Sequence, residues 1–597
     1  MFKKSVPGFV VLAVVSIASL AGCAGAAGNA PNSNSSALSP AANSNPLTTP
    51  AATKPNSPST TPSVPSTSPS ANPTTPPPSV SLSIAPLSVT VPAGATQPFA
   101  ATVKNTSNTA VIWQVNGVTG GNATVGTISP KGVYTAPLSP PPGGSVTIMA
   151  VSQADGTQSS CATVTPVFSQ ASLNGRYVFR VIDTDLLSNF QAGAFTADGK
   201  GSLTTGIEDV NIPFGGGPIT NLAFSGTYDI GPDERGTLTI STASATSQFT
   251  FVLASSTRGQ IIEFDSTAAT FGVLLSQDQS AISNLAGAFV FGFQGEFPIT
   301  ISSLGWHPSA TSSVGQMIFD GSGGVSGLED VNAVQLLPIG FGNAASFSGT
   351  YTLGPGGRGT ATLARQLGTS HYVFYIVNAE TIEFVDVDQP NVTQGAMLVD
   401  SGEAVAQQNI SFDNSSLGST AFWLNGMGCP DAGKIPAGGG CVTRTVGVAI
   451  AGRFDTDGAG TILKGVLDNN SNGVFLDDVP LNGSYSIAAN GRGTITVNPP
   501  SGSSSNYVFW LASPSYAEFL DTNAAAMGVA QAQQAGAFSS SSLNGNFGFS
   551  LVGTSNVIGP LYFDFASVGQ MVFDGNGGLT GNENANHRKA PQSPMCP

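Results

Sequence analysis

Glutamates that recur within a long internal repeat are the residues best suited to chemistry. Glu263, Glu383 and Glu518 each precede a phenylalanine, and an aspartate follows shortly after each of them. Two carboxyl groups of this kind act as acid and base in most glycosidases. Each copy, however, places its glutamate on the strand face opposite the core aromatics, which favours solvated or arginine-paired side chains. The expected partners are the arginines of a recurring Arg-Gly-Thr signal, Arg235, Arg358 and Arg492.

Aspartates in the third copy have a spacing that suits calcium. Asp455 and Asp457 alternate before a glycine, and Asp468 opens a similar run, with Asp477 and Asp478 beyond it. Calcium binds several hard oxygens on a sharply turned loop, but neither run has the glutamate that completes an EF-hand. Turn formation is therefore the favoured interpretation, and calcium binding stays open. The aspartates at the corresponding hairpins of the other copies are expected only to form turns: Asp198, Asp320 and Asp574.

The chain has three histidines, His307, His371 and His587, and they lie in unrelated contexts. A histidine-based zinc site or a Ser-His-Asp triad therefore has little material. His307, beside Trp306, is expected in an exposed loop. The sequence contains no Walker loop, dinucleotide fingerprint or zinc motif. We therefore predict no catalytic residues, no metal site and no cofactor, and a protein that is not an enzyme.

The elements that carry these residues are strands of a repeat that starts four times, at Ser172, Asn284, Ser416 and Ser542. The starts lie too far apart for solenoid units, so each copy should be a domain with its own core. Apolar residues alternate between turn signals, as at Tyr177 to Val181, which is typical of half-buried strands. We expect about eight strands per copy. Each copy resembles a small antiparallel barrel of the lipocalin or avidin type, with a two-sheet sandwich as the alternative.

The N-terminus has the features of a targeting segment. Residues 1–22 combine a basic start with a short apolar run and end in Leu20-Ala21-Gly22, followed by Cys23. This stretch resembles a bacterial lipobox, and the resemblance implies cleavage before Cys23 and diacylation of its thiol. Ala24, in enteric-type sorting, points to the outer membrane. The alternative is an ordinary secretory signal with an incidental cysteine.

Two further segments precede the repeats. Residues 23–79 are rich in Pro, Ser and Thr and almost without charge, which predicts a disordered stalk. Residues 80–167 show short strand patterns, with Trp113 in the middle of one and a Gly-x-Tyr-x-Ala-Pro stretch beginning at Gly132. This segment resembles a bacterial Ig-like domain, in which Trp113 is expected in the core.

The predicted fold is all-β, an Ig-like sandwich followed by three complete and one truncated barrel-like repeats. The repeats span residues 168–282, 283–410, 411–538 and 539–597. The fourth stops after Asn586, and the ending from His587 to Pro597 matches nothing upstream. We hypothesise a frameshift or premature stop. Half a barrel has open edges, so this tail is expected to be disordered, swapped or aggregation-prone.

The five cysteines receive separate assignments. Cys23 is expected to carry the lipid. Cys429 and Cys441 enclose a short loop, and they form a possible disulfide in an exported protein. Cys161 is expected to be a buried thiol in a strand, and Cys596 lies in the unusual tail.

Composition limits the partners. The net charge of −15 disfavours nucleic acid. The leading hypothesis is a non-enzymatic surface lipoprotein for adhesion or binding at the cell envelope, held to the membrane at Cys23, with a surface glycan or a protein as ligand. The alternatives are an envelope enzyme acting on polysaccharide through acidic residues, and a small-ligand carrier that uses the barrel mouths.

Overall fold

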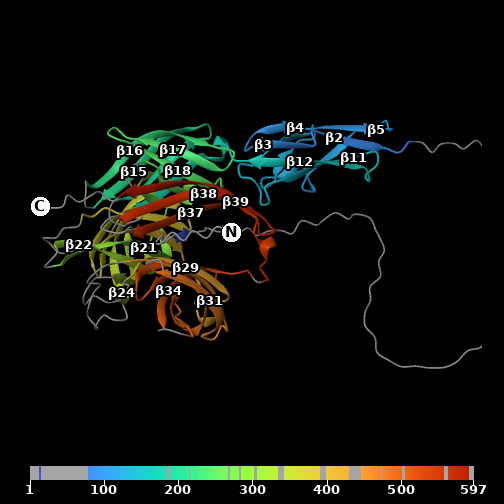
Figure 1. Ribbon diagram of the computed structural model, residues 1–597. Coiled ribbons are helices and arrows are strands. Elements are labelled where there is room, and N and C mark those ends of the chain that lie inside the picture. The colour runs from blue at the N-terminus through green and yellow to red at the C-terminus, as the bar shows by residue number, and fades with distance from the viewer. Residues whose placement is uncertain are drawn as a thin grey trace, which may run out of the picture.

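A computed structural model shows an all-β molecule with three closed barrels, which confirms the predicted fold class and the barrel over the sandwich (Figure 1). It describes residues 12–14, 78–183, 189–213, 216–265, 269–281, 284–301, 305–333, 342–389, 398–428, 446–471, 474–500, 504–534, 536–556 and 562–589. In this part of the chain, no helix is both long and apolar enough to cross a bilayer. Cys23, Cys429, Cys441 and Cys596 lie outside the described residues.

The N-terminal domain consists of short strands in sheets of five, four and two strands, with the orders β3-β12-β11-β6-β7, β4-β10-β9-β8 and β2-β5. The strands are β2 (Ser81–Ala85), β3 (Ser88–Pro92), β4 (Thr96–Pro98), β5 (Ala100–Lys104), β6 (Val111–Val115), β7 (Val118–Thr119), β8 (Gly121–Asn122), β9 (Gly126–Ile128), β10 (Val133–Thr135), β11 (Val146–Ser152) and β12 (Ser159–Val167). Trp113 is buried in the core of this domain, as predicted. The resemblance to an Ig-like domain stays a prediction.

Cys161 is exposed, so its prediction as a buried thiol is wrong. The cause is the alternation of side chains along β12. Ala162 and Val164 point into the core. The residues at odd positions of this part of β12, including Cys161, therefore point to the opposite face, towards solvent.

Each barrel has eight antiparallel strands, the first of which pairs with the last. Barrel 1 comprises β13 (Asn174–Asp183), β14 (Phe190–Asp198), β15 (Ser202–Ile212), β16 (Gly217–Ile230), β17 (Arg235–Ser241), β18 (Thr246–Ser255), β19 (Arg258–Glu263) and β20 (Thr270–Ser276). Barrel 2 comprises β21 (Ala286–Ile301), β22 (Gly305–Asp320), β23 (Gly324–Ala333), β24 (Gly342–Leu353), β25 (Arg358–Arg365), β26 (Gly368–Asn378), β27 (Thr381–Asp386) and β28 (Val399–Ala406). Barrel 3 comprises β29 (Thr420–Gly428), β30 (Val446–Thr456), β31 (Thr461–Ser471), β32 (Val474–Ile487), β33 (Arg492–Asn498), β34 (Ser505–Ser513), β35 (Tyr516–Asp521) and β36 (Ala525–Ala532).

Short 3₁₀ turns precede the repeats or join their strands. They are η1 (Gln170–Ser172), η2 (Gln279–Ala281), η3 (Pro355–Gly357), η4 (Asn414–Ser416) and η6 (Ser540–Ser542). At η1, the side chain of Ser169 accepts a hydrogen bond from the backbone amide of Ala171, and the side chain of Ser172 accepts one from the backbone amide of Ser169. The recurring serine at the start of a copy therefore closes a turn that feeds the chain into the first strand.

Aromatic side chains fill the interior of each barrel. In barrel 1, Phe179 lies at the centre and contacts the rings of Phe195, Phe224 and Phe249. The glycine on the second strand makes room for this ring, because a Cβ on Gly193 would lie 2.6 Å from Phe179. The same glycine–phenylalanine contact recurs at Gly315 with Phe291, Gly452 with Phe422 and Gly569 with Phe549. It gives a structural alignment of the four copies.

The fourth copy is ordered where the structure describes it, so the expectation of disorder is wrong for these residues. It forms a sheet of β37 (Asn544–Asn556), β38 (Tyr562–Asp574) and β39 (Leu579–Lys589). Val552, Ala566 and Val568 on its outer face pack against Val252 and Ile262 of barrel 1. Burial of this apolar face stabilises the half barrel without closure.

One edge of this sheet is also paired. The short strand β1 (Leu12–Val14) runs antiparallel to β37, with Leu12 opposite Val552. These three residues belong to the segment that the lipobox resemblance assigns to a cleaved leader. If cleavage occurs, that edge of β37 loses this strand in the mature protein.

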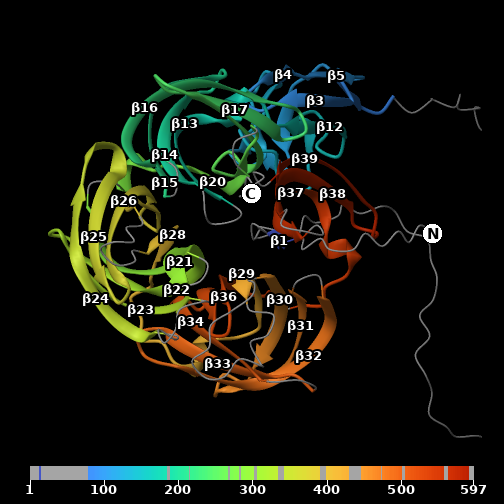
Figure 2. The same ribbon diagram turned by 60° about the vertical axis from the view of Figure 1, so that its left-hand side comes forward.

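The four copies stand in a ring (Figure 2). The first strands of barrel 1 pack on β26 and β27 of barrel 2, and those of barrel 2 pack on β34 and β35 of barrel 3. Strands β37 and β38 pack in the same way on β18 and β19 of barrel 1. Each interface therefore joins the first strands of one copy to the sixth and seventh strands of another, and the fourth copy returns to the first.

Candidate functional site

The buried carboxylate of Asp209 fastens barrel 1 to barrel 2. Arg358 of barrel 2 donates to both oxygens of Asp209, at 2.6 and 2.9 Å, and the hydroxyl of Tyr375 donates to one of them. Its hydrogen bonds to Asp209 raise the pKa of Arg358 above the usual value. Within barrel 1, Asp209 also accepts from the amide of Asn221, which has a positive φ. We call the pairing of this aspartate with the arginine of the next copy the Asp–Arg clasp.

The second clasp, between barrels 2 and 3, has the same geometry. Asp330 accepts from Arg492 at 2.6 and 2.8 Å and from the indole of Trp510 at 2.9 Å. Within barrel 2, the amide of Ala344 donates to Asp330. The arginine begins the fifth strand of its barrel, and the aromatic residue stands opposite it in the register. Two-point donation from a guanidinium to a carboxylate is among the strongest hydrogen-bonded pairings in proteins.

The third clasp joins the fourth copy to barrel 1 and has a neutral acceptor. The side-chain oxygen of Asn584, on β39, accepts from Arg235 of barrel 1 at 2.7 Å, and its amide donates to Thr250 at 2.7 Å. Val252 occupies the position of Tyr375 and Trp510 here, so no aromatic donor faces the acceptor. Arg235 keeps its charge balanced through Asp233 at 2.7 Å. Compared with the first two clasps, an asparagine therefore replaces the aspartate on one side of the contact, and a valine replaces the aromatic donor on the other.

An asparagine two residues after each clasp residue binds backbone of the next copy. The amide of Asn211 donates to the carbonyls of Asp386 and Asp388, and that of Asn332 to Asp521 and Ala524. Asn586 likewise donates to the carbonyls of Glu263 and Asp265. Because side chains two apart share one strand face, the recurring Gly-x-Glu-Asp-x-Asn segment presents both groups to its neighbour. The sequence showed the segment, but not that its partner is another copy.

The recurring glutamates are buried rather than solvated, and their predicted arginine partners are wrong. Arg235, Arg358 and Arg492 bind Asn584, Asp209 and Asp330 instead. Glu383 pairs with Arg180 of barrel 1 at 2.5 Å. For Glu383 and Glu518, the reason is that the outer face of their strands, β27 and β35, is covered by the preceding barrel and not by solvent.

The sequence alignment of the glutamates is also wrong at one position. Glu383 stands opposite Tyr375 and Glu518 opposite Trp510, and the residue in the same register of barrel 1 is Gln260, opposite Val252. Glu263 corresponds instead to Asp386 and Asp521, which stand three residues further along their strands. The carboxyl position that all three barrels share is therefore that of Glu263, Asp386 and Asp521, whereas only barrels 2 and 3 have a glutamate at the position of Glu383.

A cavity of about 140 Å³ lies where the copies meet. The residue after each central phenylalanine lines it, which places Arg180, Gly292, Trp423 and Ser550 around one space. Glu403 and Glu518 add carboxylates, and the hydroxyl of Tyr516 donates to Glu518 at 2.7 Å. Charged side chains of several copies therefore line one shared cavity.

Burial controls the charges around this cavity. Desolvation raises the pKa of Glu383 to about 7, although Arg180 lies beside it. Desolvation, together with Glu403, raises the pKa of Glu518 to about 8. Burial lowers the pKa of Arg180, but the carboxylates Glu383, Glu403 and Glu518 outweigh it and raise the pKa overall. These groups can exchange a proton near neutral pH, which is the property of a general acid or base.

We expect Glu518→Gln to flatten the dependence of stability on pH. The folded protein holds a proton on Glu518 up to about pH 8, whereas the unfolded chain loses it near the ordinary value of 4.5. Stability from this group is thus full below pH 4.5 and decreases as the pH rises towards 8. Between pH 5 and pH 8, the free energy of unfolding of Glu518→Gln should decrease by about 1–2 kcal/mol less than that of the wild type. Urea unfolding at both pH values measures this, with exposed Glu380→Gln as control; equal slopes for both variants would contradict it.

Among the described residues of the barrels, only barrel 2 has a buried arginine that binds two carboxylates. Arg365 lies 2.8 Å from both Glu329 and Asp400, and it also donates to Tyr372 and Ser313. Barrel 3 has Leu467 at the position of Glu329. Sequence analysis missed Arg365 because it lies outside the repeated motifs, and its carboxylate partners are at least 35 residues away.

The acidic pattern of the third copy divides into two groups. Asp457 accepts from the amides of Ala459, Gly460 and Thr461, and these hydrogen bonds lower its pKa to about 2. Asp198, Asp320 and Asp574 cap their hairpins in the same way. The turn interpretation is confirmed for all of them.

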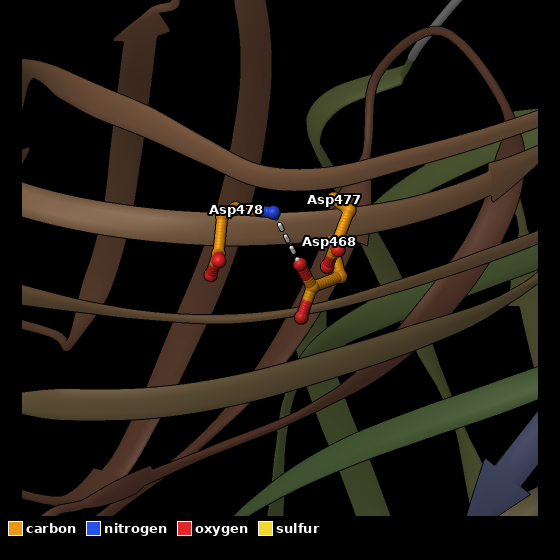
Figure 3. A group of neighbouring side chains, drawn as sticks. All are labelled: Asp468, Asp477 and Asp478. Carbon is orange, nitrogen blue, oxygen red and sulfur yellow. Dashed lines mark hydrogen bonds between the residues drawn. The ribbon is translucent and has the colours of Figure 1, made fainter.

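The second group comprises Asp468, Asp477 and Asp478 (Figure 3), whose nearest carboxylate oxygens lie within 4.8 Å of one another. All three are exposed. Asp468 accepts a 2.8 Å hydrogen bond from the amide of Asp478. It therefore repeats the bond of Asp209 to Asn221 and is the third copy's clasp residue. Its position in the repeat accounts for the carboxylate, and calcium binding by this group stays open.

The histidines do not come together. His307 lies in β22 rather than in a loop, and His587 lies in β39. His371 is half-exposed and its Nδ1 lies 2.7 Å from Asp388. These separate placements provide no shared site for the three residues.

A cavity of about 750 Å³ lies between the N-terminal domain, barrel 1 and β37. Its lining includes Leu138, Pro140 and Phe547, with Glu234 at its edge. Burial raises the pKa of Glu234, and the amide of Asn546 donates to it. We call this cavity the domain groove.

Comparison with known proteins gives no relative on which to base a function. No protein-family model matches the chain, and no curated protein sequence matches it. The argument for function therefore depends on the chain's own geometry.

Proposed function

We propose that this protein is a non-enzymatic lipoprotein of the cell envelope that serves adhesion or binding. The observation that supports this most is the use of the repeated polar residues. Asp209, Asp330 and Asn584, with their arginines, fasten one copy to another. Side chains shared by the copies therefore build a rigid ring, and a rigid array of modules suits the presentation of a binding surface.

Cavity sizes support binding between modules over catalysis at the centre. Small-molecule sites usually measure about 300–1,000 Å³. The central cavity, at about 140 Å³, is smaller, although its glutamates have the raised pKa of a glycosidase acid. The barrel interiors are filled by aromatic side chains. The domain groove has the volume of a ligand site and opens between separate modules, so it is the favoured place for a glycan or peptide ligand.

A screen on glycans and envelope proteins tests binding against turnover. The full chain should retain its ligand unchanged, and Leu138→Arg, at the rim of the domain groove, should lower affinity at least tenfold, about 1.4 kcal/mol. Leu87→Arg, which is also exposed on the N-terminal domain, is the matched control. Cleavage of a glycan by the wild type, lost in Glu518→Gln, would favour the polysaccharide enzyme instead.

Lipidation of Cys23 is tested separately. We expect Cys23→Ser to move the protein from the membrane fraction to the soluble fraction and to abolish incorporation of labelled palmitate, because the thiol is the acylated group. Globomycin should cause the unprocessed precursor to accumulate. A wild-type product that is soluble, unlabelled and insensitive to globomycin would leave an ordinary secreted protein.

A further inference from the structure

The outer face of β30–β32 on barrel 3 lies exposed where the other copies are covered. Ala192, Val314 and Val568 occupy one equivalent position and are fully buried, whereas Ala451, the residue before the glycine that contacts Phe422, is exposed. The clasp residues differ in the same way. Asp209 and Asp330 are 0% exposed, and Asp468 is exposed.

Apolar side chains surround this acidic position. Val466 is 39% exposed and Phe475 is 69% exposed. The residues that correspond to Val466 in barrels 1 and 2 are Ile207 and Leu328, which pack in the apolar contacts between barrels. We define Ala451, Val466, Asp468 and Phe475, with the carboxylates Asp477 and Asp478, as the open face. It combines an apolar surface with negative charge, as the other two docking faces do.

The fourth copy is incomplete on its inner side. Leu203, Val325 and Ile462 occupy one position of the third strand and are at most 4% exposed, whereas Leu579 is 55% exposed. In a complete barrel, the fifth to eighth strands cover this position. The same four strands carry the arginine that meets a clasp aspartate. Strands four to eight of a complete fourth barrel would thus cover both the exposed interior of the fourth copy and the open face of barrel 3.

We propose that the open face binds the remaining part, strands four to eight, of a complete fourth repeat, continuous with β37–β39, whose Arg-Gly-Thr arginine pairs with Asp468. The ring would then have four barrels and four clasps. A second copy of this chain fits less well, because Arg235, Arg358 and Arg492 are each engaged by another copy within the chain. The inference is independent of the proposed function.

A graft tests this proposal. Residues 212–277 of barrel 1 replace residues 587–597, because their Arg235 supplies the clasp and Gln260 places a neutral amide opposite Trp423. Amide hydrogen exchange in β30 and β31 should slow at least about tenfold relative to the original chain. Asp468→Ala should reverse this protection in the grafted chain, whereas in the original chain it should affect chiefly the amide of Asp478, which donates to Asp468.

Two further grafts make the outcome decisive. The corresponding segments of barrels 2 and 3 are grafted in parallel, and failure of all three to close the fourth barrel overturns the proposal. So does a closed fourth barrel that leaves β30 and β31 unprotected. The original chain is also examined by light scattering. A dimer that Phe475→Lys dissociates would assign the open face to a second copy and would equally overturn it.

Discussion

Asp330→Ala is expected to loosen the contact between barrels 2 and 3 by about 3 kcal/mol, whereas Asp468→Ala costs about 1 kcal/mol or less. Both aspartates accept a backbone amide within their own barrel. Only Asp330 also accepts from Arg492 and Trp510. Its removal leaves the indole N–H and a largely covered guanidinium without their acceptor, and the difference between the two variants isolates the clasp.

Native-state hydrogen exchange of β23 and β34 measures this effect, since it reports opening of the interface without requiring two-state unfolding of the whole chain. A double-mutant cycle of Asp330→Ala with Arg492→Ala should give a coupling energy above about 1 kcal/mol. Equal effects of Asp330→Ala and Asp468→Ala, or additive effects in the cycle, would show that the clasp does not hold the ring.

Arg365→Met should destabilise barrel 2 by about 3–5 kcal/mol at neutral pH, because it leaves Glu329 and Asp400 together inside a closed barrel. The guanidinium is almost fully buried, and both carboxylates lie 2.8 Å from it. Urea unfolding of the variant and the wild type at pH 7 measures this effect.

A matched replacement distinguishes charge from packing. Adding Glu329→Leu and Asp400→Ala to Arg365→Met makes this end of barrel 2 apolar, with a leucine as barrel 3 has at Leu467. An apolar interior of suitable size often replaces a buried ion network without loss, so the triple variant should recover at least half of the lost stability. If Arg365→Met alone is tolerated, the network contributes little to barrel 2.

The local features of the repeat could be predicted from the sequence. Alternation around Tyr177 and Phe179 predicted half-buried strands, and the Asp-Gly pairs at Asp320 and Asp574 predicted the hairpins that the structure shows. These signals act between near neighbours, so they do not depend on the rest of the fold. Strand number and the need to cover sheet edges then led to closed barrels.

Errors arose in the register of a strand, in the face to which a side chain points, and where a residue's surroundings come from a different copy. Glu263 was aligned with Glu383 and Glu518 because each precedes a phenylalanine, but strand pairing places Gln260 in that register. Cys161 was expected to be buried, although alternation with Ala162 sets it towards solvent. Arg235, Arg358 and Arg492 were expected to pair with the glutamates, but the docked neighbour supplies a nearer carboxylate or amide.

The sequence by itself determined the all-β class, the number of repeats and the inward faces of their strands, because a period of two and turn residues are written in adjacent positions. Only the tertiary structure decided what the outward faces meet. Arg358 and Asp209 are 149 residues apart, and their pairing depends on how one curved barrel surface fits another. That fit is set by side-chain shape and burial across the whole interface, which no local pattern encodes.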